Sequence, residues 1–320
     1  MSIQAVSIPA VDLDHYKNGS EEEKRAFANA LGKAYHEVGF VAVKNHGISD
    51  ELINGYYDSV KRFFELPVAD KEKYEIESLA GQRGYTSFGR EHAKGSDAPD
   101  LKEFWQTGQY LDGEVSNKLE YPDNVLVNEI PEFNDLSEQL FKSFETTGAL
   151  LLKSIAKYLD LEEDYFDSQI RNGNSILRAI HYPPIVGEPK SSLRAEQHED
   201  INLITLLVGA SAQGLELLTR EDKWLPVTAP DGHIIVNVGD MLQRLTNNKL
   251  RSTTHRVVNP PRELWHTSRY SIPFFLHPVS EMPLDCLDSC VTEDNPLAYE
   301  PITAGQYLRE RLIEIGLLKE

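Results

Sequence analysis

The stretch Gln197-His198-Glu199-Asp200, followed by the apolar run 201–208, decides the fold of this chain. Side chains alternate between the two sides of an extended strand, so we expect His198 and Asp200 to point toward one place. A further histidine stands much later, in Thr254-His255-Arg256-Val257, and must come from a strand that returns beside the first. The spacing therefore predicts a sheet that is wound on itself.

Two imidazoles and one carboxylate form a ligand set that leaves open positions on Fe(II). The pair His198 and Asp200 is weak evidence alone, because 10 His and 51 acidic residues in 320 give about 1.6 His-x-acid pairs by chance. The segments around the pair and His255 decide its meaning. We interpret the three residues as candidate metal ligands that require a sheet to bring them together.

Short apolar segments separated by turns follow the motif, and they span 201–208, 215–218, 224–227, 233–238, 253–258 and 268–276. In the fourth segment Ile234, Val236 and Val238 alternate with other residues, as they do on a strand with two different faces. Many short strands at this spacing predict a barrel or jelly roll.

Arg269 and Ser271 share one face of the last of these strands by the same period of two. The planar guanidinium of arginine suits a carboxylate, and serine adds a hydroxyl donor. The flanking apolar residues indicate a buried strand, where an unpaired charge is costly. We therefore expect the pair to hold the far carboxylate of a small acid whose other end chelates the metal.

The motifs in their order resemble the isopenicillin N synthase-like family of Fe(II)/2-oxoglutarate-dependent oxygenases. The resemblance covers most of the chain and rests on His181-Tyr182-Pro183-Pro184, His198-Glu199-Asp200, Gly214-Leu215-Glu216, Asn237-Val238-Gly239-Asp240, His255-Arg256-Val257 and Arg269-Tyr270-Ser271. Segments 8–13, 38–48, 63–67 and 100–103 resemble the family's amino-terminal signatures. The resemblance implies a mixed α and β fold, with a double-stranded β-helix (jelly-roll) core, flanking amino-terminal helices and a carboxy-terminal helix.

The same resemblance implies a reaction. Fe(II) would be held by His198, Asp200 and His255, and 2-oxoglutarate would be held by Arg269, Ser271 and Tyr182. Dioxygen would take the remaining position on the metal. Oxidative decarboxylation of 2-oxoglutarate would then drive hydroxylation, desaturation or cyclisation of a small organic molecule.

Two positions depart from the family pattern. Glu199 stands where a threonine is common, which places an extra carboxylate beside the metal or facing away from it. Ile180 stands where an asparagine often helps to hold 2-oxoglutarate, which leaves Tyr182 as the remaining candidate. Arg178 and His181 are further candidates for this contact or are structural residues.

The stretch 81–110 is rich in glycine, polar and aromatic residues, and long loops of this kind tend to carry function. In the family this region often borders the substrate pocket, whereas a surface loop without ligand contacts is the alternative. Our candidate substrate contacts, inside and outside this stretch, are Arg83, Tyr85, Arg90, Phe104, Glu199 and Phe275.

Helical patterns fill the remaining segments. Ser20-Glu21-Glu22-Glu23 is a capping box before a helix that ends near Gly39, and Ser49 precedes a second helix that stops at Pro67. One long helix is predicted over 131–159, and 303–315 is predicted as a last helix that acts either as a lid or as packing. We divide the chain into an amino-terminal region 1–120 and a jelly-roll catalytic core 121–320, joined as one compact unit.

Composition excludes several classes of protein. The net charge of −19 disfavours nucleic acid, since binding phosphates needs a basic face. No apolar run approaches the length of a membrane span, and no signal peptide is evident, so we expect a cytoplasmic protein.

Cys286 and Cys290 are interpreted as reduced thiols without a metal or disulfide role. We expect a monomer or weak homodimer that acts on a small molecule.

Three other functions remain open. An iron enzyme of the same fold that does not use 2-oxoglutarate, of the isopenicillin N synthase or aminocyclopropane-carboxylate oxidase type, would also contain an Arg-x-Ser pair. A non-catalytic jelly-roll binding protein would not need the complete set of metal ligands. A zinc hydrolase would need a separate general base, and none is apparent in the sequence.

Overall fold

The computed structural model describes residues 8–79, 81–91, 99–111, 113, 121–189, 191–209 and 213–314. In spatial order the large sheet contains β1 (Ala10–Asp12), β2 (Phe40–Lys44), β10 (His233–Val238), β7 (Ile204–Val208), β12 (Arg269–Leu276), β5 (Ile176–Tyr182), β4 (Glu103–Gly108) and β3 (Gly84–Thr86). The small sheet contains β6 (Ala195–His198), β11 (His255–Val257), β8 (Leu215–Leu218) and β9 (Trp224–Pro226). The predicted mixed α and β class with a jelly-roll core is confirmed.

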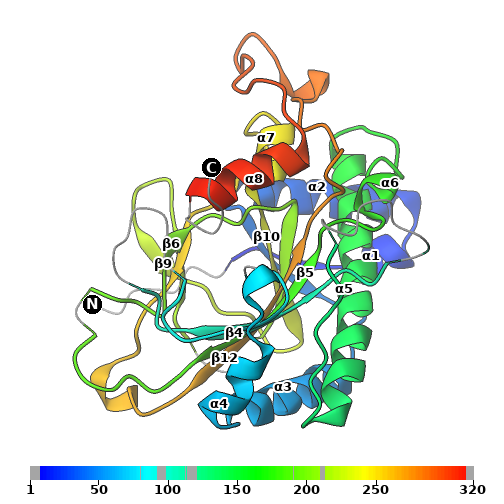
Figure 1. The fold of residues 1–320 in the computed structure, drawn as a ribbon. Coiled ribbons are helices and arrows are strands. Elements are labelled where there is room, and N and C mark those ends of the chain that lie inside the picture. Colours follow the sequence, from blue (N-terminus) through cyan, green and yellow to red (C-terminus); the bar gives the residue numbers. More distant parts are fainter. Residues whose placement is uncertain are drawn as a thin grey trace.

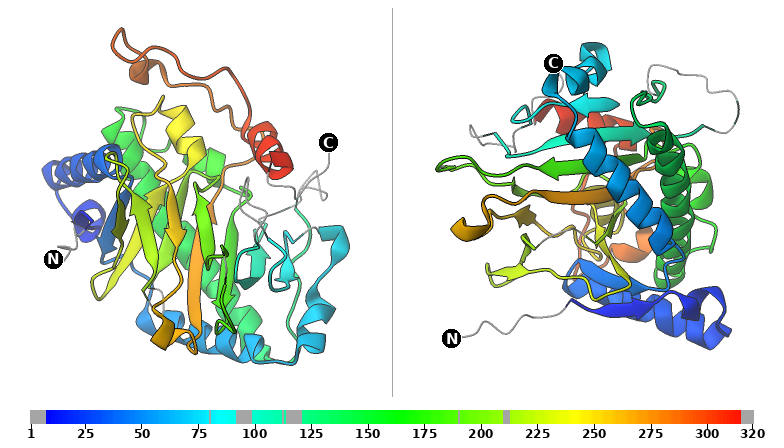
Figure 2. Two further views of the ribbon diagram at one scale, coloured as in Figure 1. Left: turned by 90° about the vertical axis from the view of Figure 1, so that its left-hand side faces the viewer. Right: turned by 90° about the horizontal axis from the view of Figure 1, so that it is seen from below.

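The helices are α1 (Asp14–Lys17), α2 (Glu21–Glu37), α3 (Asp50–Phe64), α4 (Val68–Lys71), α5 (Pro131–Tyr158), α6 (Asp167–Ile170), α7 (Asp240–Leu245) and α8 (Ala304–Glu314). Short 3-10 turns cover Glu72–Tyr74, Glu77–Leu79, Arg262–Leu264 and Asp288–Cys290. The small-sheet strands β6 and β9 lie on one side of the large sheet, and α5 stands on the other (Figure 1). Seen from below, the green α5 runs along one side of the strands (Figure 2, right).

The interior between the two sheets is filled from both of them. One apolar cluster joins Phe40 and Ile235 of the large sheet to Leu217 of the small sheet. A second cluster joins Phe104 and Tyr182 of the large sheet to Val257 of the small sheet. The two sheets therefore enclose a lined interior, and inward-facing side chains of every strand are candidates for the site.

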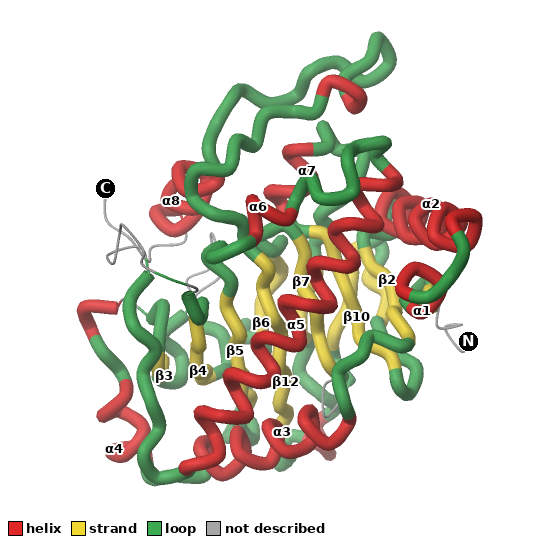
Figure 3. Tube along the Cα trace, turned by 90° about the vertical axis from the view of Figure 1, so that its right-hand side faces the viewer, coloured by secondary structure: helices red, strands yellow, loops and turns green. Residues whose placement is uncertain are grey.

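The outer face of the large sheet is covered by helices, with α5 crossing it diagonally (Figure 3). Phe274 of β12 stacks on Phe144 of α5, with ring centroids 5.2 Å apart, and meets Phe141 edge to face at 5.0 Å. All three rings are fully buried. This aromatic contact fixes which face of β12 is covered, and so which face is left for the interior.

The predicted helix starts are confirmed by their caps. The Ser20 hydroxyl accepts from the Glu23 N–H and the Glu23 side chain accepts from the Ser20 N–H, which completes the capping box of α2. The Ser49 hydroxyl accepts from the Leu52 N–H at the start of α3. The long helix and the last helix differ from their predicted bounds by about a residue at the ends. Residue 315 of the predicted last helix lies outside the described residues.

Both edges of the large sheet come from the amino-terminal part of the chain. β2 pairs with β10 and carries β1 outside it, while β4 pairs with β5 and carries β3 outside it. The predicted regions 1–120 and 121–320 therefore contribute strands to one sheet, and the boundary between them stays a prediction.

The first metal motif is only partly extended, contrary to our expectation of one strand through both residues. β6 ends at His198, where it pairs with His255, and Asp200 lies in the loop that follows. The carbonyl of Asp200 accepts a hydrogen bond from the N–H of Asp240 at 2.8 Å. This bond takes the place of the strand-to-strand hydrogen bonds that β6 makes with β11. Asp200 is thus fixed by the start of α7 and not by the small sheet.

Two predictions from composition concern other features of the chain. Cys286 and Cys290 are both free thiols, the first half-buried and the second buried. None of the described helices is both long and apolar enough to cross a membrane.

Truncating Phe274 to alanine should lower the free energy of unfolding by about 3–5 kcal/mol, because it empties the contact between β12 and α5. Urea denaturation followed by circular dichroism measures this loss. Phe88 is the matched control, since its side chain is 50% exposed and Phe88→Ala should change stability little. Equal losses for the two variants would contradict the described packing.

Candidate metal centre and active site

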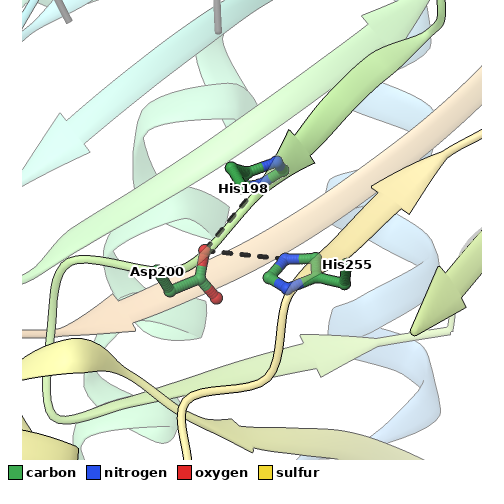
Figure 4. Close-up of side chains that lie close together, drawn as sticks. All are labelled: His198, Asp200 and His255. Carbon is green, nitrogen blue, oxygen red and sulfur yellow. Dashed lines mark ion pairs between the residues drawn. The ribbon is translucent and has the colours of Figure 1, made fainter. Parts of the chain in front are cut away.

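Three predicted ligands come together where β6 and β11 pair (Figure 4). His198 ends β6, His255 begins β11 opposite it, and Asp200 reaches toward both from the loop after β6. The Nε2 atoms of His198 and His255 lie 4.0 and 3.8 Å from Asp200 Oδ1. One possible ligand atom from each residue lies within 4.8 Å of the others, so a single ion can be reached by all three.

The backbone sets the form of both imidazoles. His198 Nδ1 lies 2.7 Å from the Glu196 carbonyl oxygen, and His255 Nδ1 lies 3.1 Å from that of Thr253. A carbonyl oxygen only accepts, so each Nδ1 must carry the proton and donate it. In the neutral form of either ring the lone pair is then on Nε2, and both Nε2 atoms face Asp200.

The carboxylate of Asp200 is held on one oxygen and presented on the other. Its Oδ2 accepts from Thr205 Oγ1 at 2.6 Å and from Asn237 Nδ2 at 2.8 Å, which leaves Oδ1 toward the histidines. Burial alone would raise the pKa of Asp200, but the two imidazoles and these hydrogen bonds lower it. Asp200 is therefore an anion fixed in the orientation that a metal ligand needs.

His198 is a neutral base near pH 7. Desolvation by the surrounding protein lowers the pKa of His198 to about 4, and the charge of the neighbouring His255 adds to this lowering. The side chain is nevertheless 41% exposed. A metal does not have to displace a proton from this ring at neutral pH. Because part of the His198 ring is exposed, one side of the metal position is not covered by protein.

The predicted carboxylate-binding residues lie together at one end of the interior. Arg269 and Ser271 point inward from β12, and Tyr182 on β5 stands opposite Arg269 in the pairing. The Arg269 guanidinium carbon lies 4.9 Å from the centre of the Tyr182 ring. A cavity of about 550 Å³ at this end is lined by Arg269, Leu207 and Ile235 among others.

Two predicted substrate contacts lie toward the other end of the interior. Phe104 of β4 is buried and Phe275 of β12 is half-buried. The guanidinium of Arg178 on β5 lies between their rings, 4.3 Å from the centre of Phe104 and 5.4 Å from that of Phe275. Phe275 pairs in register with Thr205, whose hydroxyl binds Asp200, so this end borders the candidate metal position.

Of the other predicted substrate contacts, Tyr85 and Arg90 lie outside the interior, whereas Arg83 lies on the interior side of β4 beside Gly108. Tyr85 points to the helix-covered face, where it packs on Phe63 and donates to the Glu103 carboxylate. Arg90 is 57% exposed and pairs with Glu75. Arg83 is buried against Gly108 and donates to the Gln82 carbonyl at 2.8 Å. Residues 92–98 of the same stretch lie outside the described residues.

Glu199 turns away from the other two residues of its motif. Its Oε1 accepts from Thr254 Oγ1 at 3.0 Å, and it is not part of the group that can share one ion. Burial raises the pKa of Asp240 to about 7, and the nearby carboxylate of Glu199 adds to this rise. Tyr307 of α8 donates to Asp240 at 3.2 Å, so Glu199 faces the packing of the last helix.

His181, the alternative carboxylate contact, also faces away from the interior. Its Nδ1 lies 2.7 Å from Glu103 and its Nε2 lies 3.0 Å from Ser268. Its ring stacks on Tyr270 at 4.7 Å. These contacts account for both ring nitrogens, so His181 is a structural residue of the large sheet.

Several residues around the site were missed from the sequence. Thr205 and Asn237 are polar positions within otherwise apolar strands, and that interruption was a usable signal. Glu91 and Lys102 carry no such signal, because their ion pair at 2.5 Å joins a loop to the residue before β4. Such long-range pairs are set by tertiary packing alone.

Replacing Thr205 by valine should weaken Fe(II) affinity by about tenfold, because Asp200 loses one of the two donors that orient it. Anaerobic titration of Fe(II), monitored by calorimetry, measures this affinity. Thr205→Ser retains the hydroxyl and should bind as the unaltered chain does. Unchanged affinity in the valine variant would mean that Asn237 alone orients the carboxylate.

Comparison with known proteins supports this arrangement. Residues 8–132 match the family described as non-haem dioxygenase in morphine synthesis N-terminal, and residues 173–278 match the 2OG-Fe(II) oxygenase superfamily. The 2-oxoglutarate-dependent dioxygenase frbA of Dothideomycetidae sp. (strain 11243) is 31% identical over 96% of this chain and 97% of its own. The proline hydroxylase buaE of Petromyces alliaceus is 33% identical over 97% of this chain and 99% of its own.

Solved structures agree with these relatives. A protein of Caulobacter crescentus, described as of the 2OG-Fe(II) oxygenase family, has a TM-score of 0.87 at 44% identity and covers 97% of this chain and 99% of its own. A full-length protein of Neurospora crassa, solved in complex with alpha-KG and thymine, has a TM-score of 0.84 at 28% identity and covers 98% of each chain. The chain belongs to the 2OG-Fe(II) oxygenase superfamily, and it is an Fe(II)- and 2-oxoglutarate-dependent dioxygenase.

Proposed function

We propose that His198, Asp200 and His255 bind the Fe(II) of this dioxygenase. The observation that carries the assignment is that both Nε2 lone pairs and one free oxygen of Asp200 converge from three segments. Two imidazoles and one carboxylate form the facial ligand set typical of non-haem Fe(II) oxygenases. A closed structural zinc site would require a fourth ligand, and none is found within this group of described residues.

The far carboxylate of 2-oxoglutarate is assigned to Arg269, with Ser271 and Tyr182 beside it. Arg269 is 1% exposed and points into the interior from β12, so a dianion can approach it away from bulk water. Ile180 lies opposite Ser271 and offers no polar group, so Tyr182 supplies the polar contact on β5. On this arrangement we assign the chain to the isopenicillin N synthase-like branch of the superfamily.

Bound Fe(II) supplies the oxidant from dioxygen while 2-oxoglutarate is converted to succinate and carbon dioxide. The residues of the chain orient the metal and the co-substrate, and Phe104 and Phe275 keep water from the reacting side. The oxidised substrate is a small organic molecule, in keeping with the thymine bound to the Neurospora crassa protein. A cytoplasmic location and a monomer or weak homodimer stay predictions.

Removal of one ligand should abolish both metal binding and turnover. His198→Ala should leave the fold intact, because its side chain is 41% exposed, and neither His198→Ala nor Asp200→Ala should release succinate from 2-oxoglutarate. Calorimetric titration with Fe(II) and chromatographic detection of succinate under air check the two effects. Succinate release by either variant would refute the ligand assignment, and oxygen uptake without succinate would point to an iron oxidase.

Arg269→Ala should mainly raise the KM for 2-oxoglutarate, since a buried charge-assisted contact contributes about 2–5 kcal/mol. Fe(II) affinity should change little, because Arg269 lies outside the group of candidate metal ligands. Arg262→Gln is the matched control, since that side chain is 79% exposed and pairs with Glu188 on the surface. An unchanged KM in the Arg269 variant would place the co-substrate carboxylate elsewhere.

A further inference from the structure

A second arginine faces the interior at the end opposite Arg269. Arg178 and Tyr182 lie on the same face of β5, because they are separated by an even number of residues. About 13 Å of strand separates the two positions at about 3.3 Å per residue. Tyr182 stands beside Arg269, so Arg178 marks the other end of the enclosed space. Neither the metal site nor the co-substrate assignment uses this guanidinium.

Arg178 is held in one orientation before any ligand arrives. Its guanidinium lies over the Phe104 ring at 4.3 Å and close to Phe275 at 5.4 Å. Its Nε donates to Gln106 Oε1 at 3.0 Å, and its Nη1 lies 3.3 Å from Glu91 Oε1. Arginine has five N–H donors, so these two contacts leave donors for a ligand. The side chain is 19% exposed and can therefore be reached.

The position of Arg178 relative to the metal ligands is set by strand pairing. Its strand β5 pairs with β12, and β12 pairs with β7, which carries Thr205 beside Asp200. Two strand spacings of about 4.8 Å place Arg178 roughly 10 Å from that strand. Phe275 fills the space between them on the interior face. A ligand held by Arg178 therefore extends along Phe275 toward the metal.

Four charged side chains at this end balance one another. Lys102 pairs with Glu91 at 2.5 Å and with Asp100 at 2.7 Å, so Lys102 and Arg178 together balance these two carboxylates. Burial alone would raise the pKa of Glu91, but Lys102 and Arg178 lower it to about 2, so it is ionised. No charge is left over within this group of four.

Arg83 adds one further positive charge. It is 1% exposed, no described carboxylate pairs with it, and its Nε and Nη2 have no hydrogen-bond partner among the described residues. The Arg83 guanidinium carbon lies 1.8 Å from the position that a Cβ atom would take at Gly108. Gly108 and Gln106 lie on the same, inward face of β4, so the Arg83 guanidinium lies in the interior next to Gln106. Burial lowers the pKa of Arg83 to about 10, and it remains charged at neutral pH.

We propose that Arg178 is the specificity-determining residue of this dioxygenase and that the oxidised substrate is a small monocarboxylic acid with an apolar skeleton. The proposal rests on the function proposed above. The carboxylate of the substrate meets the guanidinium of Arg178, which is already oriented by Phe104 and Gln106. The skeleton lies along Phe275, which pairs in register with Thr205, and so brings a C–H bond toward the metal position. The charge of Arg83, which lies beside Gln106 and has no carboxylate partner among the described residues, favours an anion over its neutral analogue.

Direct binding of matched acids and amides tests this assignment. The probes are phenylacetate, phenylpropionate and phenylbutyrate with their amides, titrated by calorimetry into the anaerobic protein loaded with Fe(II) and saturating 2-oxoglutarate. At least one acid should bind about tenfold or more tightly than its amide, because only the acid makes a charge-assisted pair. Arg178→Gln should remove that preference while leaving the Kd of 2-oxoglutarate within about twofold. Arg262→Gln should retain the preference.

Three outcomes would overturn the proposal. The first is that no acid binds more tightly than its amide. The second is that the preference for the acid survives in Arg178→Gln. The third is that the acid competes with 2-oxoglutarate, which would mean that it binds at Arg269. Failure of the proposed function is distinguished by the first step, since the protein would then not bind 2-oxoglutarate in the presence of Fe(II). Thermal unfolding of each variant verifies that a lost preference is not a lost fold.

Discussion

The two faces of β12 determine how this molecule is built. The strand lies between β5 and β7 in the large sheet, and its register places Phe274 against α5 while Arg269, Ser271 and Phe275 face the interior. A shift of one residue would exchange these faces and bury the charge under the helix. The aromatic packing outside therefore fixes the co-substrate arginine inside. Stability and function depend on the same alternation.

Asp200 links the two sheets at the metal position. Its side chain is held by Thr205 of β7 and Asn237 of β10, both in the large sheet. The histidines that it meets come from β6 and β11 of the small sheet. The three ligand groups can converge only if the sheets hold their relative positions. The metal site is thus a consequence of closing the jelly roll and also a contact that can stabilise the closure.

Much of this arrangement could be predicted from the sequence because it follows from local periodicity. The period of two placed Arg269 and Ser271 on one face, and the serines before acidic residues marked the starts of two helices. Tyr85 was misleading because β3 has three residues, and only its pairing with β4 decides which way each side chain points. The environment of Arg178 could not be predicted, since Gln106 and Glu91 reach it through tertiary packing.

Asp200 binds the metal through Oδ1, as we propose, while Thr205 and Asn237 keep their hydrogen bonds to Oδ2. A crystal structure of the protein grown anaerobically with Fe(II) and 2-oxoglutarate measures this directly. We expect the metal to be coordinated by His198 Nε2, His255 Nε2 and Asp200 Oδ1, with Oδ2 still accepting both hydrogen bonds. A metal bound through Glu199, or one that draws both oxygens of Asp200 away from Thr205 and Asn237, would contradict it.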